Sequence, residues 1–263
     1  MINQKFDRHI GEAFVQFRGD QIVMVSLVGS QNYGLATEYS DVDTKCCVLP
    51  SWIDIVQAHQ PYSHTYIFED GEHIDFTDFR EMMKILKKQN INFLEQLFTD
   101  TYFVNDIYEE EVEKLRQHRE DIAHYNPRKC VDTMAGIARS KETRIFRPLG
   151  EDKDVAFNAY GYHPKELMQL CRIEEFLKKY TNGDSFEQCL KTSQRDWLLE
   201  LKAGVYEPEE AKAIMVLKMN SVNEMYKSFI MTHDITNLPA IDFLMEEVTE
   251  SIFRKYLKKY VLS

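Results

Sequence analysis

The sequence predicts an α+β protein in which a small mixed-sheet domain is followed by an all-helical domain. Short β-branched segments bounded by turn residues occur only before about residue 105. Beyond that point, apolar residues recur at helical spacing in long stretches. The 263 residues are enough for one large domain or two small ones. No Pro/Gly/Ser-rich linker separates the two parts, so we expect a soft boundary between a domain at 1–106 and one at 107–263.

The first part is predicted to alternate helices and strands. Its helical segments show apolar residues three or four apart, and its strands are short and rich in β-branched residues. The Asp70-Gly71 pair is a turn signal between two strands. The expected elements are a helix at 4–18, strands at 22–28, 41–49, 65–69 and 72–77, a helix at 79–88 and a short helix at 93–98.

The second part is predicted to be helical throughout. The expected helices lie at about 108–121, 127–144, 164–181, 186–202, 207–231 and 239–260, with a loop at 150–161. A cleft between the two domains is the natural place for a ligand, because ligand sites favour concave junctions between domains.

Composition narrows the class of protein. The net charge of -11 argues against sequence-blind binding along duplex nucleic acid, which needs a basic surface, but not against a local basic pocket. Five cysteines without CxxC spacing make a zinc finger or a disulfide framework unlikely, which favours a reducing, cytoplasmic location. The N-terminus has no signal-peptide pattern. The sequence contains no run of about 18 apolar residues, so we expect no membrane-spanning helix and no membrane partner.

The segment LVGSQNYGLATEYSDVDTKCCVL, residues 27–49, contains the most informative pattern. A buried strand ends at Gly29-Ser30, where a short helix is expected to start and Gly34 to end it. Free N–H groups at such a start attract anions, and glycine lets a phosphate approach the backbone closely. On the Gly-Ser pair alone, a plain strand-to-helix junction is the more common interpretation.

Carboxylates follow this turn. On a strand from residue 41 to 49, Asp41 and Asp43 would point to the same face, because side chains alternate with period two. Asp75, between apolar neighbours on a later strand, would be an unpaired buried charge unless it joined them. Three convergent carboxylates suit a two-metal site, with Mg²⁺ as the usual ion for oxygen ligands. An isolated Asp-x-Asp is more often a solvated strand end.

In combination, these residues resemble the nucleotidyltransferase superfamily typified by DNA polymerase beta. They are more closely similar to the predicted nucleotidyltransferase family associated with RNA-repair operons of bacteria and phages. The family pattern GS-x-x-YG-x-A-T-x-x-SD-x-D is matched by Gly29, Ser30, Tyr33, Gly34, Ala36, Thr37, Ser40, Asp41 and Asp43. The resemblance continues through the Asp75 strand and residues 92–98, although Ile91-Asn92 stands where the family often has Asn-Pro.

A weaker resemblance lies in the helical part. Lys165 and Arg172 match the basic positions of the family's Y-x-x-K-x-x-x-H-x-x-R-L helix, while residues 168–170 lack its histidine. Seven residues apart, the two cations share one helix face. The resemblance implies that they contact the nucleotide phosphates; without it, a solvated helix face is the simpler interpretation.

The resemblance implies a palm-like nucleotidyltransferase domain that transfers a nucleoside monophosphate from an NTP to a hydroxyl and releases pyrophosphate. Asp41 and Asp43 would hold two Mg²⁺ or Mn²⁺ ions, and Asp75 would bind the catalytic one and help to deprotonate the acceptor. The expected nucleotide contacts are Gly29, Ser30, Tyr33, Ser40, Lys165 and Arg172. The helical domain would close the nucleotide cleft.

Several alternatives stay open on the sequence alone. The acceptor could be an RNA 3′ end, a protein hydroxyl or a small molecule. A catalytically silent nucleotide-binding or partner-binding module is the competing class, although all three acids are retained. Tyr33 could equally be a buried residue that closes the turn. A basic run, formed by Arg139, Lys141, Arg144 and Arg147, could receive a nucleic-acid end or pair with the acidic surface.

Overall fold

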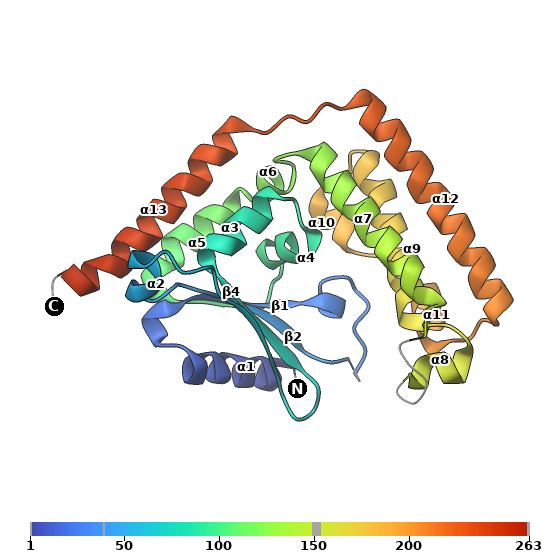
Figure 1. The fold of residues 1–263 in the computed structure, drawn as a ribbon, viewed down its shortest axis with the longest axis horizontal. Helices are drawn as coiled ribbons and strands as arrows, with labels where there is room; N and C mark the ends of the chain where they lie inside the picture. The colour runs from blue at the N-terminus through green and yellow to red at the C-terminus, as the bar shows by residue number, and fades with distance from the viewer. Residues whose placement is uncertain (1, 39, 149–153, 262–263) are drawn as a thin grey trace. The chain divides into compact units, whose positions relative to one another are not determined.

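The computed structural model describes residues 2–38, 40–148 and 154–261. Its architecture is α+β, as predicted: a five-stranded mixed sheet and many helices (Figure 1). The chain forms two compact units. The first comprises the described residues up to 32, those at 36–126 and those from 237 on, and the second comprises 33–35 and 127–236. The two compact units therefore do not divide at residue 106. The boundary of the catalytic domain stays a prediction.

The sheet belongs to the first unit and has the strand order β3-β4-β2-β1-β5. Strands β2 and β4 pair in parallel, and the other neighbours are antiparallel. The strands are β1 (Ile22–Val28), β2 (Asp43–Val48), β3 (Ser63–Ile67), β4 (His73–Asp78) and β5 (Tyr102–Val104). The β3–β4 hairpin turns at Asp70-Gly71, as the sequence indicates.

One face of the sheet is covered by helix α1 (Ile2–Gln16), which lies against it in Figure 1. Phe6 and Ala13 of α1 join a core cluster with Cys46 of β2 and with Ile74 and Phe76 of β4. Because side chains alternate along a strand, the residues between these apolar positions point to the opposite face. Asp43 of β2 and Asp75 of β4 therefore lie on the face away from α1.

The other helices of the first unit follow apolar spacing and local caps. Helix α3 starts at the N-cap Asp78, whose carboxylate accepts from the Arg80 N–H and stabilises the free helix start. The predicted helix at 108–121 is in fact two helices that meet at His118. The helices are α2 (Trp52–Val56), α3 (Phe79–Lys87), α4 (Ile91–Leu94), α5 (Glu109–Gln117), α6 (Arg119–Ala123) and α13 (Pro239–Val261).

The second unit is built around α9, a largely buried helix that packs against four others. Its helices are α7 (Pro127–Ile145), α8 (Val155–Tyr160), α9 (Pro164–Thr181), α10 (Phe186–Leu190), α11 (Arg195–Ala203) and α12 (Pro208–Thr232).

Two predictions for this unit were wrong in detail. Residues 155–160 of the predicted loop are helical, while its residues 150–153 lie outside the described part. The predicted helix at 186–202 breaks because the backbone N–H groups of Thr192 and Ser193 bond to groups outside it, the Tyr33 carbonyl and the Glu175 carboxylate.

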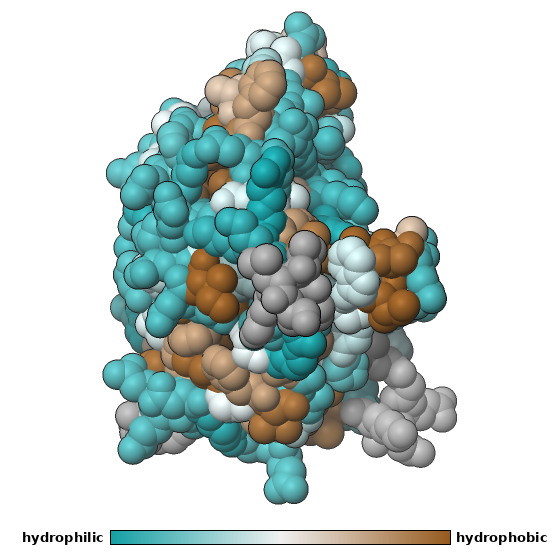
Figure 2. All heavy atoms as spheres, turned by 90° about the vertical axis from the view of Figure 1, so that its left-hand side faces the viewer, coloured by the Kyte–Doolittle hydropathy of each residue, from teal (hydrophilic) through white to brown (hydrophobic). Residues whose placement is uncertain are grey.

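The surface is mostly hydrophilic on the side that carries α2 and the end of α13, with separate hydrophobic patches (Figure 2). Trp52, Ile53 and Val56 of α2 are among the exposed apolar residues. None of the described helices has both the length and the apolar character needed to cross a bilayer. All five cysteine side chains are buried.

Candidate active site

The Gly29-Ser30 turn follows β1 directly, as expected, but the helix that starts there is a single 3₁₀ turn, Gly29–Gln31. Gly29 and Gly34 have φ values of 80° and 72°, in the left-handed region that favours glycine. The Gly29 N–H donates to Glu95 Oε2 over 3.2 Å, and the Asn32 side-chain amide donates to the same oxygen over 3.0 Å. Glu95 is only 2% exposed, so one of the N–H groups expected to bind phosphate is bonded to a buried carboxylate.

Asp43 is the first residue of β2 and lies beside this turn. A Cβ atom added to Gly29 would lie 3.5 Å from Asp43 Oδ2, an ordinary contact distance, so the carboxylate directly adjoins the turn. Asp43 Oδ1 lies 2.9 Å from Nδ1 of His73, its register partner on β4. The hydrogen bond to Asp43 raises the pKa of His73 above its usual value, because the carboxylate favours the protonated imidazole.

Asp75 lies two residues further along β4, opposite Lys45 of β2. Lys45 Nζ donates to Asp75 Oδ2 over 2.9 Å, and the Thr65 hydroxyl donates to Oδ1 over 2.6 Å. Burial alone would raise the pKa of Asp75, but the charge of Lys45 and these hydrogen bonds outweigh it, and the pKa lies below its usual value. Asp75 is therefore not an unpaired charge: Lys45, which also lies over the Phe93 ring, neutralises it.

Asp41 does not lie on the strand, which corrects the sequence prediction. β2 begins at Asp43, so the shared-face argument does not apply to Asp41, whose side chain is exposed. Before the strand, the Thr37 N–H donates to Ser40 Oγ and the Ser40 N–H donates to the Thr37 carbonyl. Ser40 and Thr37 line a hollow of about 400 Å³ together with residues of the α1 start.

No three His, Cys, Asp or Glu side chains in the described ranges are grouped so that they could hold a metal ion. Asp43 and Asp75 share a face of the sheet, and each is bonded to a positively charged or protonatable side chain from the neighbouring strand. Their carboxylate oxygens are the ligands that Mg²⁺ prefers. The metal site and the roles of the three acids stay predictions.

Tyr33, Lys165 and Arg172 all belong to the second unit. The Arg172 guanidinium lies over the Tyr33 ring, with its Cζ 3.7 Å from the ring centroid. Arg172 is 8% exposed, and its Nη1 has no hydrogen-bond partner among the described residues. Lys165 is exposed on the first turn of α9. The structure thus brings Tyr33 and Arg172 together, with Tyr33 buried rather than open to solvent.

Half of the basic run pairs within its own unit. Arg139 lies over the Tyr226 ring, and Lys141 Nζ lies 3.1 Å from Glu166 Oε2, an ion pair without hydrogen-bond geometry. Arg144 and Arg147 are exposed. Both interpretations of the run therefore stay open.

Four residues of the site were not singled out from the sequence: Lys45, Glu72, His73 and Glu95. The period of two along β2 and β4 could have found Lys45 and His73, because each lies two residues from a predicted acid. Glu72 and Glu95 had no such signal. Packing of the strands and of α4 brings their carboxylates to backbone N–H groups of the site, those of Val42 and Gly29.

The model of the family described as RlaP, RNA repair pathway DNA polymerase beta family, matches residues 1–241. No curated protein matches the chain. The matched region includes the Gly29 turn, all three predicted acids and the helix that carries Lys165 and Arg172.

Proposed function

Because the chain belongs to the RlaP family, the RNA repair pathway DNA polymerase beta family, we propose that it transfers a nucleoside monophosphate from an NTP to a hydroxyl acceptor and releases pyrophosphate. The observation that carries the proposal is the position of Asp43 and Asp75. They lie on one face of the paired strands β2 and β4, and Asp43 adjoins the Gly29 turn.

Asp43 and Asp75, with Asp41 just before the strand, are the proposed metal ligands. A bound Mg²⁺ or Mn²⁺ would supply positive charge for the phosphate oxygens. Asp75 would also accept the proton of the attacking hydroxyl. His73 and Lys45 pair with the two strand carboxylates, so a metal ion would compete with these side chains for the carboxylate oxygens.

The Gly29-Ser30 turn and Ser40 are the proposed nucleotide contacts of the first unit. For Tyr33, Lys165 and Arg172, which belong to the second unit, the proposal of a nucleotide contact rests on the family pattern. The buried Nη1 of Arg172, which has no partner within the described part of the chain, supports a contact with an anion, because a buried donor normally has an acceptor. The family description refers to RNA repair, which favours an RNA end as the acceptor. A protein hydroxyl or a small molecule remains the alternative.

The test uses each of the four NTPs labelled at the α-phosphate. The full chain is incubated with Mg²⁺ or Mn²⁺ and RNA bearing a 3′-hydroxyl, with protein, or with small hydroxyl compounds. We expect label on one acceptor, equimolar pyrophosphate, and loss of both in EDTA or in Asp75→Asn. The control Asp121→Asn makes the same change at an exposed aspartate of α6, which pairs with His118.

Two outcomes would contradict the proposal. If the protein binds NTP equally well with and without metal and labels no acceptor, it is a binding module. If Asp75→Asn and Asp121→Asn transfer label at the same rate, the proposed acids do not form the active site.

A further inference from the structure

We propose that Glu95 and Glu72 are positioning residues that fix the two ends of the segment from Gly29 to Asp43. Neither belongs to the three predicted acids. Each is buried and accepts a hydrogen bond from a backbone N–H of this segment, Glu95 from Gly29 and Glu72 from Val42. The catalytic meaning of this positioning rests on the proposed function, but the contacts themselves do not.

Glu95 fixes the start of the segment. It follows α4 and is 2% exposed, and its Oε2 accepts from both the Gly29 N–H and the Asn32 amide. These two donors lie at either end of the 3₁₀ turn, so a single oxygen sets the path of the turn. Because Asp43 lies next to Gly29, the same contact also fixes the backbone that the Asp43 carboxylate packs against.

Glu72 fixes the end of the segment. It is 1% exposed, and its Oε1 lies 3.2 Å from the Val42 nitrogen, between Asp41 and Asp43. The same carboxylate binds the side chains of Lys5, Arg8 and His9 of α1. Burial would raise the pKa of Glu72, but its hydrogen bonds and the charge of Lys5 hold the pKa below its usual value. A buried carboxylate thus ties the backbone between the two acids to the helix behind the sheet.

The two contacts make different demands on the side chain. The Gly29 N–H and the Asn32 amide donate to the same oxygen of Glu95, so glutamine, with its carbonyl oxygen in that position, keeps these two contacts and should preserve the turn. Glu72 uses both oxygens, one for Lys5 and Val42 and the other for Arg8 and His9. In Glu72→Gln, the amide NH₂ would face hydrogen-bond donors in place of one carboxylate oxygen. This change should therefore loosen the segment. A purely electrostatic role would make the two glutamine variants alike.

Hydrogen–deuterium exchange of the full chain tests the positioning without any substrate. Peptides covering residues 29–43 are compared in the parent, Glu95→Ala, Glu95→Gln and Glu72→Gln. The control is Glu111→Gln, which alters a buried glutamate of the same unit whose partners, Ser251 and Lys255, lie on α13. We expect at least tenfold faster exchange in this segment for Glu95→Ala and Glu72→Gln, and near-parental exchange there for Glu95→Gln and Glu111→Gln.

Parental exchange at residues 29–43 in both Glu95→Ala and Glu72→Gln would overturn the proposal, as would an equal increase throughout the first unit. NTP transfer is measured on the same variants, where the positioning role predicts a lower kcat for Glu95→Ala and rescue by Glu95→Gln. If the parent transfers no nucleotide, the proposed function fails while the exchange data still decide the positioning. If transfer and exchange both remain parental in the variants, the positioning fails and the function stands.

Discussion

At the scale of residues, the candidate site balances its charges within the sheet. Asp43 contacts His73, and Asp75 contacts Lys45, each across the parallel pair of β2 and β4. The acids therefore do not need a metal ion for the strands to fold side by side. Any ion that binds here must compete with side chains that the protein already supplies.

Asp43→Asn should separate catalysis from stability. The asparagine oxygen can still contact His73, and the Asp43 side chain is 32% exposed. The free energy of unfolding in EDTA should therefore change by less than about 1 kcal/mol. NTP transfer should fall by orders of magnitude, because one charge of the proposed metal site is lost. Melting curves in EDTA and transfer assays in Mg²⁺ measure the two effects, with Asp121→Asn as control. A variant that melts several degrees lower but transfers at the parental rate would make Asp43 structural.

Lys45→Met should make stability depend on metal. The lysine side chain is 12% exposed and supplies the cation next to Asp75. Without it, Asp75 keeps a negative charge that a divalent ion can neutralise, so we expect a lower melting temperature in EDTA and recovery in Mg²⁺. At ten times the dissociation constant, the ion would contribute about 1.4 kcal/mol. The parent, in which Lys45 competes for Asp75, should respond less to Mg²⁺ in the same scan; an equal response would argue against competition at this carboxylate.

At the scale of elements, sequence patterns predicted the helices and strands whose bounds are set by their own residues. β1 and α9 have the predicted bounds. β1 is a short segment rich in β-branched residues that is closed by Gly29, and α9 starts at Pro164 with apolar residues at helical spacing. β5 was missed, because three residues are too few to show a period, and it exists only by pairing with β1. The start of β2 was predicted two residues too early. Pairing with β1 and β4 determines where the strand begins, and this pairing is not visible in the residues of β2 themselves.

The candidate site divides in the same way. Gly29, Asp43 and Asp75 could be found because spacing along the chain carries the pattern. Glu72 and Glu95 could not, since a glutamate beside a turn or at the end of a short helix is ordinary. Their importance comes from burial and from backbone N–H groups that are distant in sequence. Sequence patterns therefore predicted the candidate carboxylates but not the groups that hold their backbone.

Glu175 of α9 offers a test of pH dependence at the level of elements. It is 5% exposed and accepts from the Thr192 hydroxyl, from the Ser193 N–H and hydroxyl, and from Lys179. Burial alone would raise its pKa, but these contacts lower the pKa to about 2. A pKa lowered by folding adds stability above the unfolded value, near 4.5, and this stability is lost as the pH falls toward 2.

Glu175→Gln should therefore destabilise the second unit on the order of 3 kcal/mol at pH 6, and the difference from the parent should shrink toward zero near pH 2. Urea unfolding followed by Trp197 fluorescence in a Trp52→Phe background measures this. The control Glu187→Gln, which removes an exposed pair with Lys191, should differ little from the parent at either pH. A difference for Glu175→Gln that stays constant from pH 6 to 2 would contradict the lowered pKa.

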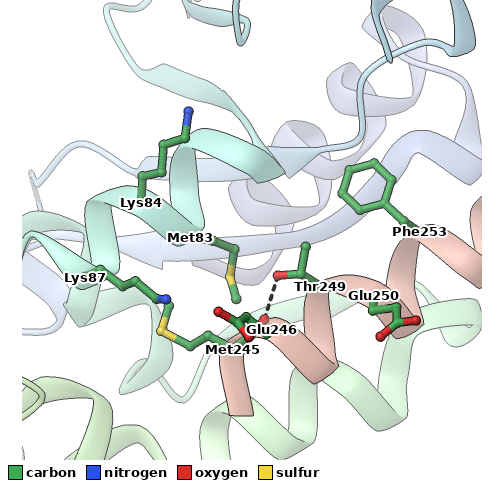
Figure 3. Close-up of a pocket in the computed structure, with 8 residues that line it drawn as sticks. All are labelled: Met83, Lys84, Lys87, Met245, Glu246, Thr249, Glu250 and Phe253. Carbon is green, nitrogen blue, oxygen red and sulfur yellow. Dashed lines mark hydrogen bonds between the residues drawn. The ribbon is translucent and has the colours of Figure 1, made fainter. Parts of the chain in front are cut away.

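At the scale of the whole molecule, the chain leaves the first unit and returns to it at the same place. The Leu238 N–H donates to the Tyr125 carbonyl over 3.0 Å, and the Asn126 amide donates to Asn237 Oδ1 over 2.7 Å. Residues 127–236 are thus inserted between neighbouring points of the first unit. After the return, α13 packs along α3 and α5, and it lines the pocket of Figure 3 with Met245 and Phe253 opposite Met83.

The family model ends at residue 241, just after α13 begins, yet this helix supplies part of the core of the first unit. The buried side chains of α13 are Ile241, Leu244, Met245, Val248, Ile252 and Tyr256. Burying one such side chain contributes about 1.5–3 kcal/mol, so losing most of them removes an amount comparable to the whole stability of a typical domain. The matched region and the folding unit are therefore not the same.

Ending the chain at residue 241 should consequently unfold the first unit, including the sheet that carries Asp43 and Asp75, although every predicted site residue is retained. Circular dichroism and exchange of β1 and β2 amides measure this, and a peptide of residues 239–261 added in excess should restore protection. Two full-length variants separate packing from mere length: Ile252→Asp, at a fully buried position, should reproduce the loss, and Phe243→Asp, at a position 72% exposed on the same helix, should not. A shortened chain that keeps parental protection in β1 and β2 would show that the sheet and its acids fold without α13.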